Sequence, residues 1–292
     1  MDSGMTIQWY PGHMAKTRRM IAEQMKLVDA VCEILDARIP LSSRNPDVGE
    51  LTAGKPQLVV LNRVDLADPD ATRRWAEYFR GKGLAVLEAN AREGKGTGRF
   101  AGAVRELLSE KLAAYAERGQ AGRTVRVMIL GIPNVGKSTF INKVSGRKTA
   151  KAEDRPGVTR SKQWISVDRG LELLDTPGML WPKFDDPAVG VRLACTGAVR
   201  EEILDVEELA SRLMAYLASH YPQALAERYR FQPEPEDSGY GLLEKAGRKR
   251  GFLMRGGQVD TERMARILLD EFQGGRLGRF TLELPEEAPH VC

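Results

Sequence analysis

The chain has 292 residues, of which 42% are hydrophobic and 29% charged, as expected for a globular protein of one or two domains. Three cysteines without paired spacing argue against a disulfide framework and a zinc site. No apolar run reaches the roughly 18 residues of a membrane helix, and no signal pattern opens the sequence, so we expect a cytoplasmic protein. The net charge of +4 combines +8 in residues 1–180 (29 Lys and Arg, 21 Asp and Glu) with −4 in residues 181–292 (15 and 19), and the basic first part favours a polyanionic partner.

The first part of the chain alternates predicted strands with predicted helices. Apolar and β-branched runs bounded by turn residues predict strands at Ala30–Leu35, Leu58–Leu61, Leu84–Leu87, Thr124–Ile132, Trp164–Val167 and Leu171–Leu174. Helical periodicity lies between them at Ala15–Leu27, Ala71–Arg80, Gly98–Arg118 and Lys137–Ser145. Because this alternation implies parallel pairing through crossover connections, we predict an α/β domain whose mostly parallel sheet has helices on both faces.

After Pro182 only helical patterns remain. They lie at Val189–Gly197, Val206–Ser219, Gln223–Tyr229, Gly241–Ala246 and Thr261–Phe272. We therefore predict two domains, an α/β domain at residues 1–182 and a smaller all-helical domain at residues 183–292, joined near Leu180–Pro187.

Two basic segments are candidates for RNA contact. Near the N-terminus, Lys16, Arg18 and Arg19 accompany the aromatic residues Trp9 and Tyr10, and such side chains hold phosphates and stack on bases. The second segment, in the helical domain, consists of Arg248, Lys249, Arg250 and Arg255. For each segment the alternative is an ordinary solvated face.

The segment Gly131–Ser138 (GIPNVGKS) fits the phosphate-loop pattern G-x-x-x-x-G-K-[ST], with an apolar strand before it and a helix after it. Glycines let the backbone N–H groups surround phosphate oxygens, and the helix N-terminus adds partial positive charge. Lys137 is suited to the β- and γ-phosphates and Ser138 to Mg²⁺. The residues of this loop that we expect to bind nucleotide are Pro133, Asn134, Val135, Gly136, Lys137, Ser138 and Thr139.

The segment Asn62–Asp65 (NRVD) follows a predicted strand and resembles the Asn-Lys-x-Asp guanine-recognition motif. The Asp65 carboxylate can accept hydrogen bonds from guanine N1–H and N2–H, which adenine does not offer, so an ATPase is disfavoured. Asn62 would hold the loop and face the purine, and Arg63, in place of the usual Lys, would cover the base. A looser match, Asn90 and Ala91 after the next strand, resembles the loop that flanks guanine with backbone groups.

Two further segments resemble the switches of GTPases. In Asp175–Gly178 (DTPG), Asp175 would help to hold Mg²⁺ and the Gly178 N–H would sense the γ-phosphate. Thr159, 21 residues after Ser138, resembles the threonine that closes on Mg²⁺ when the γ-phosphate is present, the alternative being a turn with a capping threonine. The expected metal ligands are thus Ser138, Thr159 and Asp175.

The order of these motifs is unusual, because the guanine motif precedes the phosphate loop and Asp175–Gly178 comes last. The order predicts a circularly permuted P-loop GTPase fold. One consequence is that the second switch, residues 175–180, leads directly into the helical domain. We hypothesise that loss of the γ-phosphate changes how that domain is held.

Several longer strings resemble the YlqF/RbgA family of circularly permuted ribosome-biogenesis GTPases. Beside the loop and second-switch motifs, they are Trp9–Met14 (WYPGHM), Asp36–Pro40 (DARIP), Ser42–Pro46 (SSRNP), Arg155–Thr159 (RPGVT) and Leu180–Lys183 (LWPK). The resemblance covers nearly the whole chain. It implies GTP hydrolysis coupled to late maturation of the large (50S) ribosomal subunit, contacts with its rRNA and proteins, and a C-terminal domain of RNA-binding type.

The residue after Gly178 is Met179, where many small GTPases have a Gln that orients the attacking water. Hydrolysis therefore needs another group, and the family resemblance implies His13, whose imidazole can orient water or accept its proton. The alternative for His13 is a loop residue that packs with neighbouring aromatic side chains. Lys137 and Thr159 complete the expected catalytic set.

Asn134 has two interpretations. In related GTPases an asparagine at this position helps to hold a K⁺ that neutralises phosphate charge, and the alternative is a residue that shapes the loop through positive φ. The cofactors expected from the sequence are therefore GTP or GDP, Mg²⁺ and, on the first interpretation, K⁺.

Three classes of function remain. The first is a GTPase that docks on a pre-ribosomal particle, and the second is a GTP-sensing scaffold with little hydrolysis. The third, a GTPase acting on another RNA such as tRNA, would require a folate, flavin or metal site, and the few cysteines argue against a metal site. We expect a monomer without a membrane or DNA partner.

Overall fold

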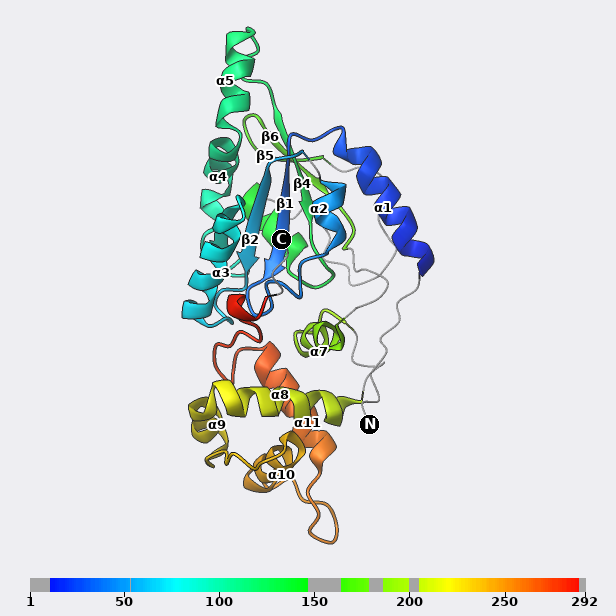
Figure 1. Ribbon diagram of the computed structural model, residues 1–292, viewed down its shortest axis with the longest axis vertical. Coiled ribbons are helices and arrows are strands. Elements are labelled where there is room, and N and C mark those ends of the chain that lie inside the picture. Colours follow the sequence, from blue (N-terminus) through cyan, green and yellow to red (C-terminus); the bar gives the residue numbers. More distant parts are fainter. Residues whose placement is uncertain (1–10, 53, 147–163, 179–185, 200–204, 289–292) are drawn as a thin grey trace. The chain divides into compact units, whose positions relative to one another are not determined.

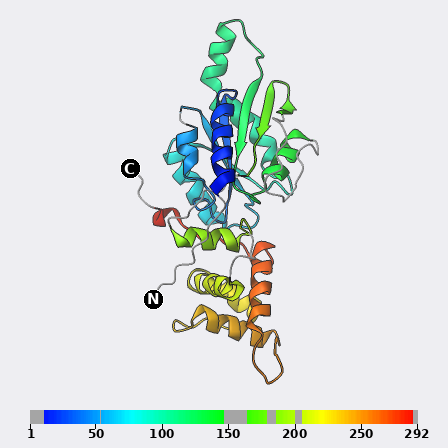
Figure 2. The same cartoon turned by 90° about the vertical axis from the view of Figure 1, so that its right-hand side faces the viewer.

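The computed structural model describes residues 11–52, 54–146, 164–178, 186–199 and 205–288, with the backbone alone for residues 11–17 and 287 (Figures 1 and 2). Contacts divide these residues into two compact units. The α/β unit holds the described residues from 11 to 178 together with 283–288, and the helical unit holds those from 186 to 282. No helix in these ranges is long and apolar enough to cross a membrane.

A six-stranded sheet forms the centre of the α/β unit, in the order β3-β2-β1-β4-β6-β5. The strands are β1 (Ala30–Asp36), β2 (Gln57–Asn62), β3 (Ala85–Ala89), β4 (Val125–Leu130), β5 (Trp164–Asp168) and β6 (Leu171–Asp175). All neighbours pair in parallel except β5, which runs antiparallel to β6 at one edge. The six predicted strands and the mostly parallel sheet are confirmed.

Helices α1 (Pro11–Met25), α2 (Asp47–Leu51) and α3 (Pro69–Gly81) cover one face of the sheet. Ile21 of α1 and Val48 of α2 join a buried cluster with Met128 of β4, and Trp75 of α3 packs in a second cluster with Leu35 of β1. Because side chains of a strand alternate between faces, residues of opposite parity point to the other layer. There, Phe100 and Phe140 make an edge-to-face contact at 5.4 Å between α4 (Phe100–Leu107) and α6 (Lys137–Ser145).

The single helix predicted over residues 98–118 is divided in the structure. A 3₁₀ turn at Thr97–Arg99 leads into α4, and α5 (Ser109–Glu117) begins after Leu108. Leu108 is buried and lies outside helical geometry, at φ −106° and ψ 16°, whereas α5 buries no residue. The apolar pattern continued across the break, but only its first half has a core to cover, and α5 extends beyond the sheet (Figure 1).

The helical unit contains α7 (Pro187–Cys195), α8 (Val206–His220), α9 (Pro222–Tyr229), α10 (Gly239–Lys249) and α11 (Thr261–Gln273). These five helices confirm the predicted pattern; four are longer than predicted by one to five residues, and α7 lies two residues earlier in the chain than predicted. Helix α8 packs against the other four and buries Leu209, Leu213 and Leu217. A Cβ at Gly239 would lie 2.0 Å from the Ser211 carbonyl oxygen, so a glycine allows α10 to approach the α8 backbone.

The predicted helical domain ran to residue 292, whereas the structure returns the chain to the α/β unit at Glu283. The Trp75 indole N–H donates to the Glu283 carbonyl oxygen at 2.9 Å, and Ala288 joins the cluster around Trp75 and Phe79. The helical unit therefore ends at Leu282, and residues 283–288 complete the core beside α3.

Candidate nucleotide-binding site

The phosphate loop connects β4 to α6 at the carboxyl edge of the parallel strands, where open α/β sheets bind ligands. Two of its glycines are required by close packing. A Cβ at Gly136 would lie 2.5 Å from the Asn62 side-chain nitrogen, and one at Gly131 would lie 2.9 Å from the Ile34 carbonyl oxygen. Helix α6 begins at Lys137, directly after the loop, so its N-terminal N–H groups and partial positive charge lie at this edge.

Lys137 and Asp175 face each other beside this loop, with Nζ and Oδ1 separated by 3.7 Å. Burial lowers the pKa of Lys137, and burial raises the pKa of Asp175. Asp175 Oδ1 is buried and accepts no hydrogen bond from any residue that the structure describes. A carboxylate oxygen in this state suits a hard cation such as Mg²⁺, which Asp175 and the half-buried Ser138, at the start of α6, would hold.

Asn62, at the end of β2, joins two loops of the site. Its Nδ2 donates to the Val135 carbonyl oxygen at 2.9 Å, and its Oδ1 accepts a hydrogen bond from the Ala91 N–H at 3.0 Å. With 1% of its surface exposed, Asn62 fixes the phosphate loop against the loop that follows β3. The second of those loops is itself ordered by Asn90, whose Oδ1 accepts from the Glu93 N–H.

Arg63 connects the guanine motif to the phosphate loop by a second route. Its guanidinium donates to the Asn134 carbonyl oxygen at 2.6 Å and to Asp36 Oδ2 at 3.4 Å. Asp36 also receives two hydrogen bonds from the fully buried Arg38 side chain. Although burial opposes ionisation, Arg38 and Arg63 hold the pKa of Asp36 below its ordinary value. These contacts of Asp36 and Arg38 were not predicted from the sequence, where two opposite charges at the end of a mostly apolar strand were the available signal.

Other predicted residues take varied positions around this centre. The side chain of Asp65 is exposed beside Arg63, as a carboxylate that meets a ligand base must be, and Asn134 is exposed with φ +59°, as its loop-shaping interpretation requires. A Cβ at Gly178 would lie 2.9 Å from the Pro133 nitrogen, so the end of the second switch borders the phosphate loop. Thr139 is exposed in the first turn of α6.

Three predictions fall on residues of which the structure says little. Thr159 and Met179 lie outside the described residues. Residue 13 lies in the helical backbone of α1, not in a loop, and its imidazole is outside the description. The structure therefore brings together residues 62–65, 90–91, 131–139 and 175–178, and it leaves His13 and Thr159 as predictions.

The two basic segments are partly neutralised. Arg18 pairs with Glu50 and Arg19 with Glu23 on the surface of α1 and α2. In the helical unit, Arg250 donates to the buried Glu271 at 2.5 Å and Arg248 pairs with Glu244. Two exposed cations of the second segment, Lys249 and Arg255, have no acidic partner within the described residues.

The sheet order, the phosphate loop between β4 and α6, and the guanine motif joined to that loop define a P-loop GTPase whose motifs are circularly permuted. A family model described as "50S ribosome-binding GTPase" matches residues 126–227. The chain is 48% identical to Ribosome biogenesis GTPase A of Bacillus cereus, over 97% of this chain and 95% of that protein.

The protein of the same name from Thermotoga maritima is 31% identical over 98% and 97% of the two chains. The solved GNP-bound YlqF from T. maritima is similar with a TM-score of 0.64 at 28% identity, and it covers 94% of this chain and 100% of that one. The chain belongs to the ribosome biogenesis GTPase A family, which confirms the YlqF/RbgA resemblance. Membership implies binding of guanine nucleotide with Mg²⁺ and GTP hydrolysis.

Proposed function

We propose that this protein hydrolyses GTP to GDP and phosphate while docked on the precursor of the large ribosomal subunit, late in 50S assembly. The names of its relatives and the description of the matching family model support a ribosomal partner. The observation that carries the proposal is the junction at Asn62, which joins the guanine motif, the phosphate loop and the loop after β3. The proposal includes a monomer in the cytoplasm that binds rRNA and ribosomal proteins, without a DNA or membrane partner.

Within this proposal each part of the site has a task. The Asp65 carboxylate accepts the guanine N1–H and N2–H groups, and Lys137 meets the β- and γ-phosphates. Ser138, Thr159 and Asp175 would hold Mg²⁺, which would supply positive charge against the phosphate oxygens. The Gly178 N–H senses the γ-phosphate. The buried oxygen of Asp175, which accepts no hydrogen bond from a described residue, supports this assignment.

Hydrolysis is expected to be slow in the isolated protein. Met179 cannot orient the attacking water, so the proposal gives that task to His13 once docking brings it to the site. A K⁺ held at Asn134 would neutralise charge between the phosphates, and the φ of +59° at Asn134 serves the loop equally without K⁺. The second candidate function, a GTP-sensing scaffold, is favoured by the same missing glutamine.

The test is GTP turnover at saturating Mg²⁺, in K⁺ and in Na⁺ buffer, with and without purified large subunits. We expect stimulation by the subunits, faster turnover in K⁺, and loss of the stimulated rate in His13→Ala with GTP affinity unchanged. Wild-type protein that binds GTP tightly without any stimulation by mature or immature subunits would favour the scaffold. Equal rates in Na⁺ and K⁺ would remove the cation from the proposal, and an unchanged His13→Ala rate would remove the histidine.

A further inference from the structure

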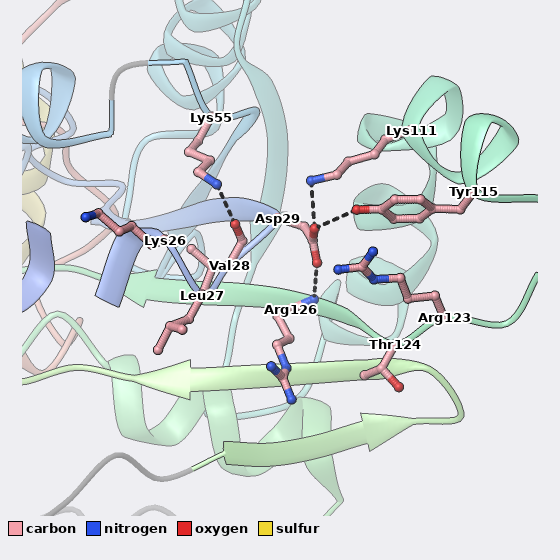
Figure 3. Close-up of a pocket in the computed structure, with 10 residues that line it drawn as sticks. All are labelled: Lys26, Leu27, Val28, Asp29, Lys55, Lys111, Tyr115, Arg123, Thr124 and Arg126. Atoms are coloured by element: carbon pink, nitrogen blue, oxygen red, sulfur yellow. Dashed lines mark hydrogen bonds and ion pairs between the residues drawn. The ribbon is translucent and has the colours of Figure 1, made fainter. Parts of the chain in front are cut away.

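A basic recess of about 430 Å³ lies at the amino edge of the sheet, between the end of α1, the start of β4 and α5 (Figure 3). It is open to solvent. Its charged lining consists of five cations and one carboxylate: Lys26, Lys55, Lys111, Arg123, Arg126 and Asp29. The phosphate loop follows the other end of β4, so the six residues of this strand place the recess about 17 Å from the nucleotide site.

Asp29 organises the interior of the recess. Its carboxylate accepts hydrogen bonds from Lys111 Nζ at 2.6 Å and from the Arg126 backbone N–H at 2.9 Å, and the Tyr115 hydroxyl lies at 3.3 Å. Although burial opposes ionisation, these donors hold the pKa of Asp29 below its ordinary value. A charged Asp29 therefore fixes Lys111 and Tyr115 of α5 against the start of β4.

Three of the other cations are also held in place. The Arg123 guanidinium lies over the Tyr115 ring at 4.5 Å, and that of Arg126 lies over the Trp164 ring at 4.6 Å. Lys55 Nζ donates to the Val28 carbonyl oxygen at 2.7 Å. A guanidinium above an aromatic ring keeps its N–H groups available at the ring's edge, and a cation that is already ordered loses little freedom when it binds an anion.

The positive charge of the recess exceeds its carboxylates. Asp29 pairs with Lys111, and Glu172 pairs with Arg126 at 3.1 Å, which leaves three of the five cations without a compensating acid among the described residues. Lys26 and Arg123, which stand at opposite ends of the recess in Figure 3, are both exposed and make no ion pair with a described residue. A solvated surface interleaves charges of both signs, so an excess of one sign around a hollow indicates an anionic ligand.

We propose that this recess binds the phosphodiester backbone of RNA. Spaced Lys and Arg side chains that contact phosphates, without a pocket that encloses a base, are suited to a polyanion that runs across an open surface. The site at the opposite edge of the sheet stays free for GTP. The inference deepens the proposed function and rests on it for the choice of RNA as the polyanion.

The test measures binding of a fluorescein-labelled 16-nucleotide oligouridylate to the full chain with GDP, by anisotropy between 50 and 200 mM KCl. The test variant is Lys26→Gln/Arg123→Gln. The matched control is Arg73→Gln/Arg80→Gln, which removes two exposed cations from α3. Each lost phosphate contact reduces the salt slope by roughly 0.7, so the test variant should bind about 20-fold more weakly at 0.1 M salt, with a slope lower by roughly 1.4. The control should change neither value, and GDP affinity should stay the same in both.

Three results would each overturn the proposal that the recess binds RNA. They are no oligouridylate binding by the wild type, an unchanged affinity in the test variant, and an equal loss of affinity in the control. A second measurement on the same proteins separates this inference from the proposed function. It is the concentration of large subunits that gives half-maximal stimulation of GTP turnover. If the wild-type protein binds oligouridylate through the recess but large subunits do not stimulate its GTP turnover, RNA binding by the recess is supported and the proposed ribosome-stimulated hydrolysis is refuted. If the test variant needs the same subunit concentration as the wild type for half-maximal stimulation, only the proposed role of the recess is refuted.

Discussion

The carboxylate of Glu283 joins the C-terminal segment to the loop after β1 by three hydrogen bonds, which makes its removal a sharp test of this fold. Oε1 accepts hydrogen bonds from the backbone N–H groups of Leu41 and Ser42, the second at 2.9 Å, and Oε2 accepts from the Ser42 hydroxyl at 2.5 Å. Glu283 is 3% exposed. The loop that it holds begins after Asp36, the residue that Arg63 contacts beside the phosphate loop.

The magnitude follows from the donors that Glu283→Ala leaves behind. The buried Ser42 N–H and the part-buried Leu41 N–H lose their acceptor, at about 1–3 kcal/mol each, so we expect the attachment to weaken by about 3 kcal/mol. Glu283→Gln keeps one oxygen for the two N–H groups and loses the charge, so about 1 kcal/mol is expected. Glu286→Ala, a control in the same segment, removes only the exposed pair with Arg74 and should cost less than about 1 kcal/mol.

Amide hydrogen exchange read by mass spectrometry measures this attachment locally. A loss of 3 kcal/mol raises the open population by about 100-fold, so exchange in the peptide that contains Leu41 and Ser42 should accelerate by that order in Glu283→Ala. GDP affinity should fall by up to about tenfold, because the Ser43 hydroxyl of the same loop accepts the Asp36 N–H at 3.0 Å. Unchanged exchange in Glu283→Ala, or equal acceleration in Glu286→Ala, would refute the reasoning.

Three further predictions concern the site and the core. Asp65→Asn should reduce GDP affinity by about 10- to 100-fold without improving ADP affinity, measured by calorimetry, and retention of the preference for GDP would place guanine recognition elsewhere. Gly136→Ala should weaken GDP binding at least about tenfold, because its methyl would lie 2.5 Å from the Asn62 side chain at a φ of +93°; wild-type affinity would contradict the observed packing. Burial raises the pKa of Glu33 to about 7 despite its ion pair with Arg44. Between pH 4.5 and 7, Glu33 is therefore protonated in the folded chain but ionised in the unfolded chain. Wild-type stability, relative to Glu33→Gln, should therefore fall by about 3 kcal/mol between pH 4.5 and 7 in urea titrations, and parallel pH profiles would exclude this origin.

Regular elements were predictable because their signals are local. The strand at β1 is a mostly apolar run, interrupted by Glu33, that the structure buries on both faces, and α6 begins and ends where its pattern does. The short helix α2 was not predicted, because five residues are too few to show a helical period. The break at Leu108 was missed for another reason, since it depends on where the core ends and not on the periodicity of the segment.

The site divides in the same way. The phosphate loop and the guanine motif have sequence patterns fixed by their ligand, so each could be found alone. Asp36, Arg38 and Glu283 have no such pattern, because their roles arise from neighbours that are distant in the chain. The hydrogen bond from the Ser42 N–H to the buried Glu283 carboxylate joins residues 241 positions apart, so it cannot be predicted from periodicity or composition.

The permuted motif order is compatible with an intact site because the site depends on neighbouring strand ends, not on chain order. Asn62, Asp36 and Asp175 are the last residues of β2, β1 and β6, and the phosphate loop follows β4; these four strands are consecutive in the sheet. Permutation changes instead what is attached to these ends. The chain that continues from Asp175 leads into the helical unit, and the chain that leaves this unit returns as Glu283 to the loop after β1. The segment before the first connection contacts the phosphate loop directly, because Gly178 borders Pro133. The segment after the second connection is linked to that loop indirectly, through the loop after β1, Asp36 and Arg63.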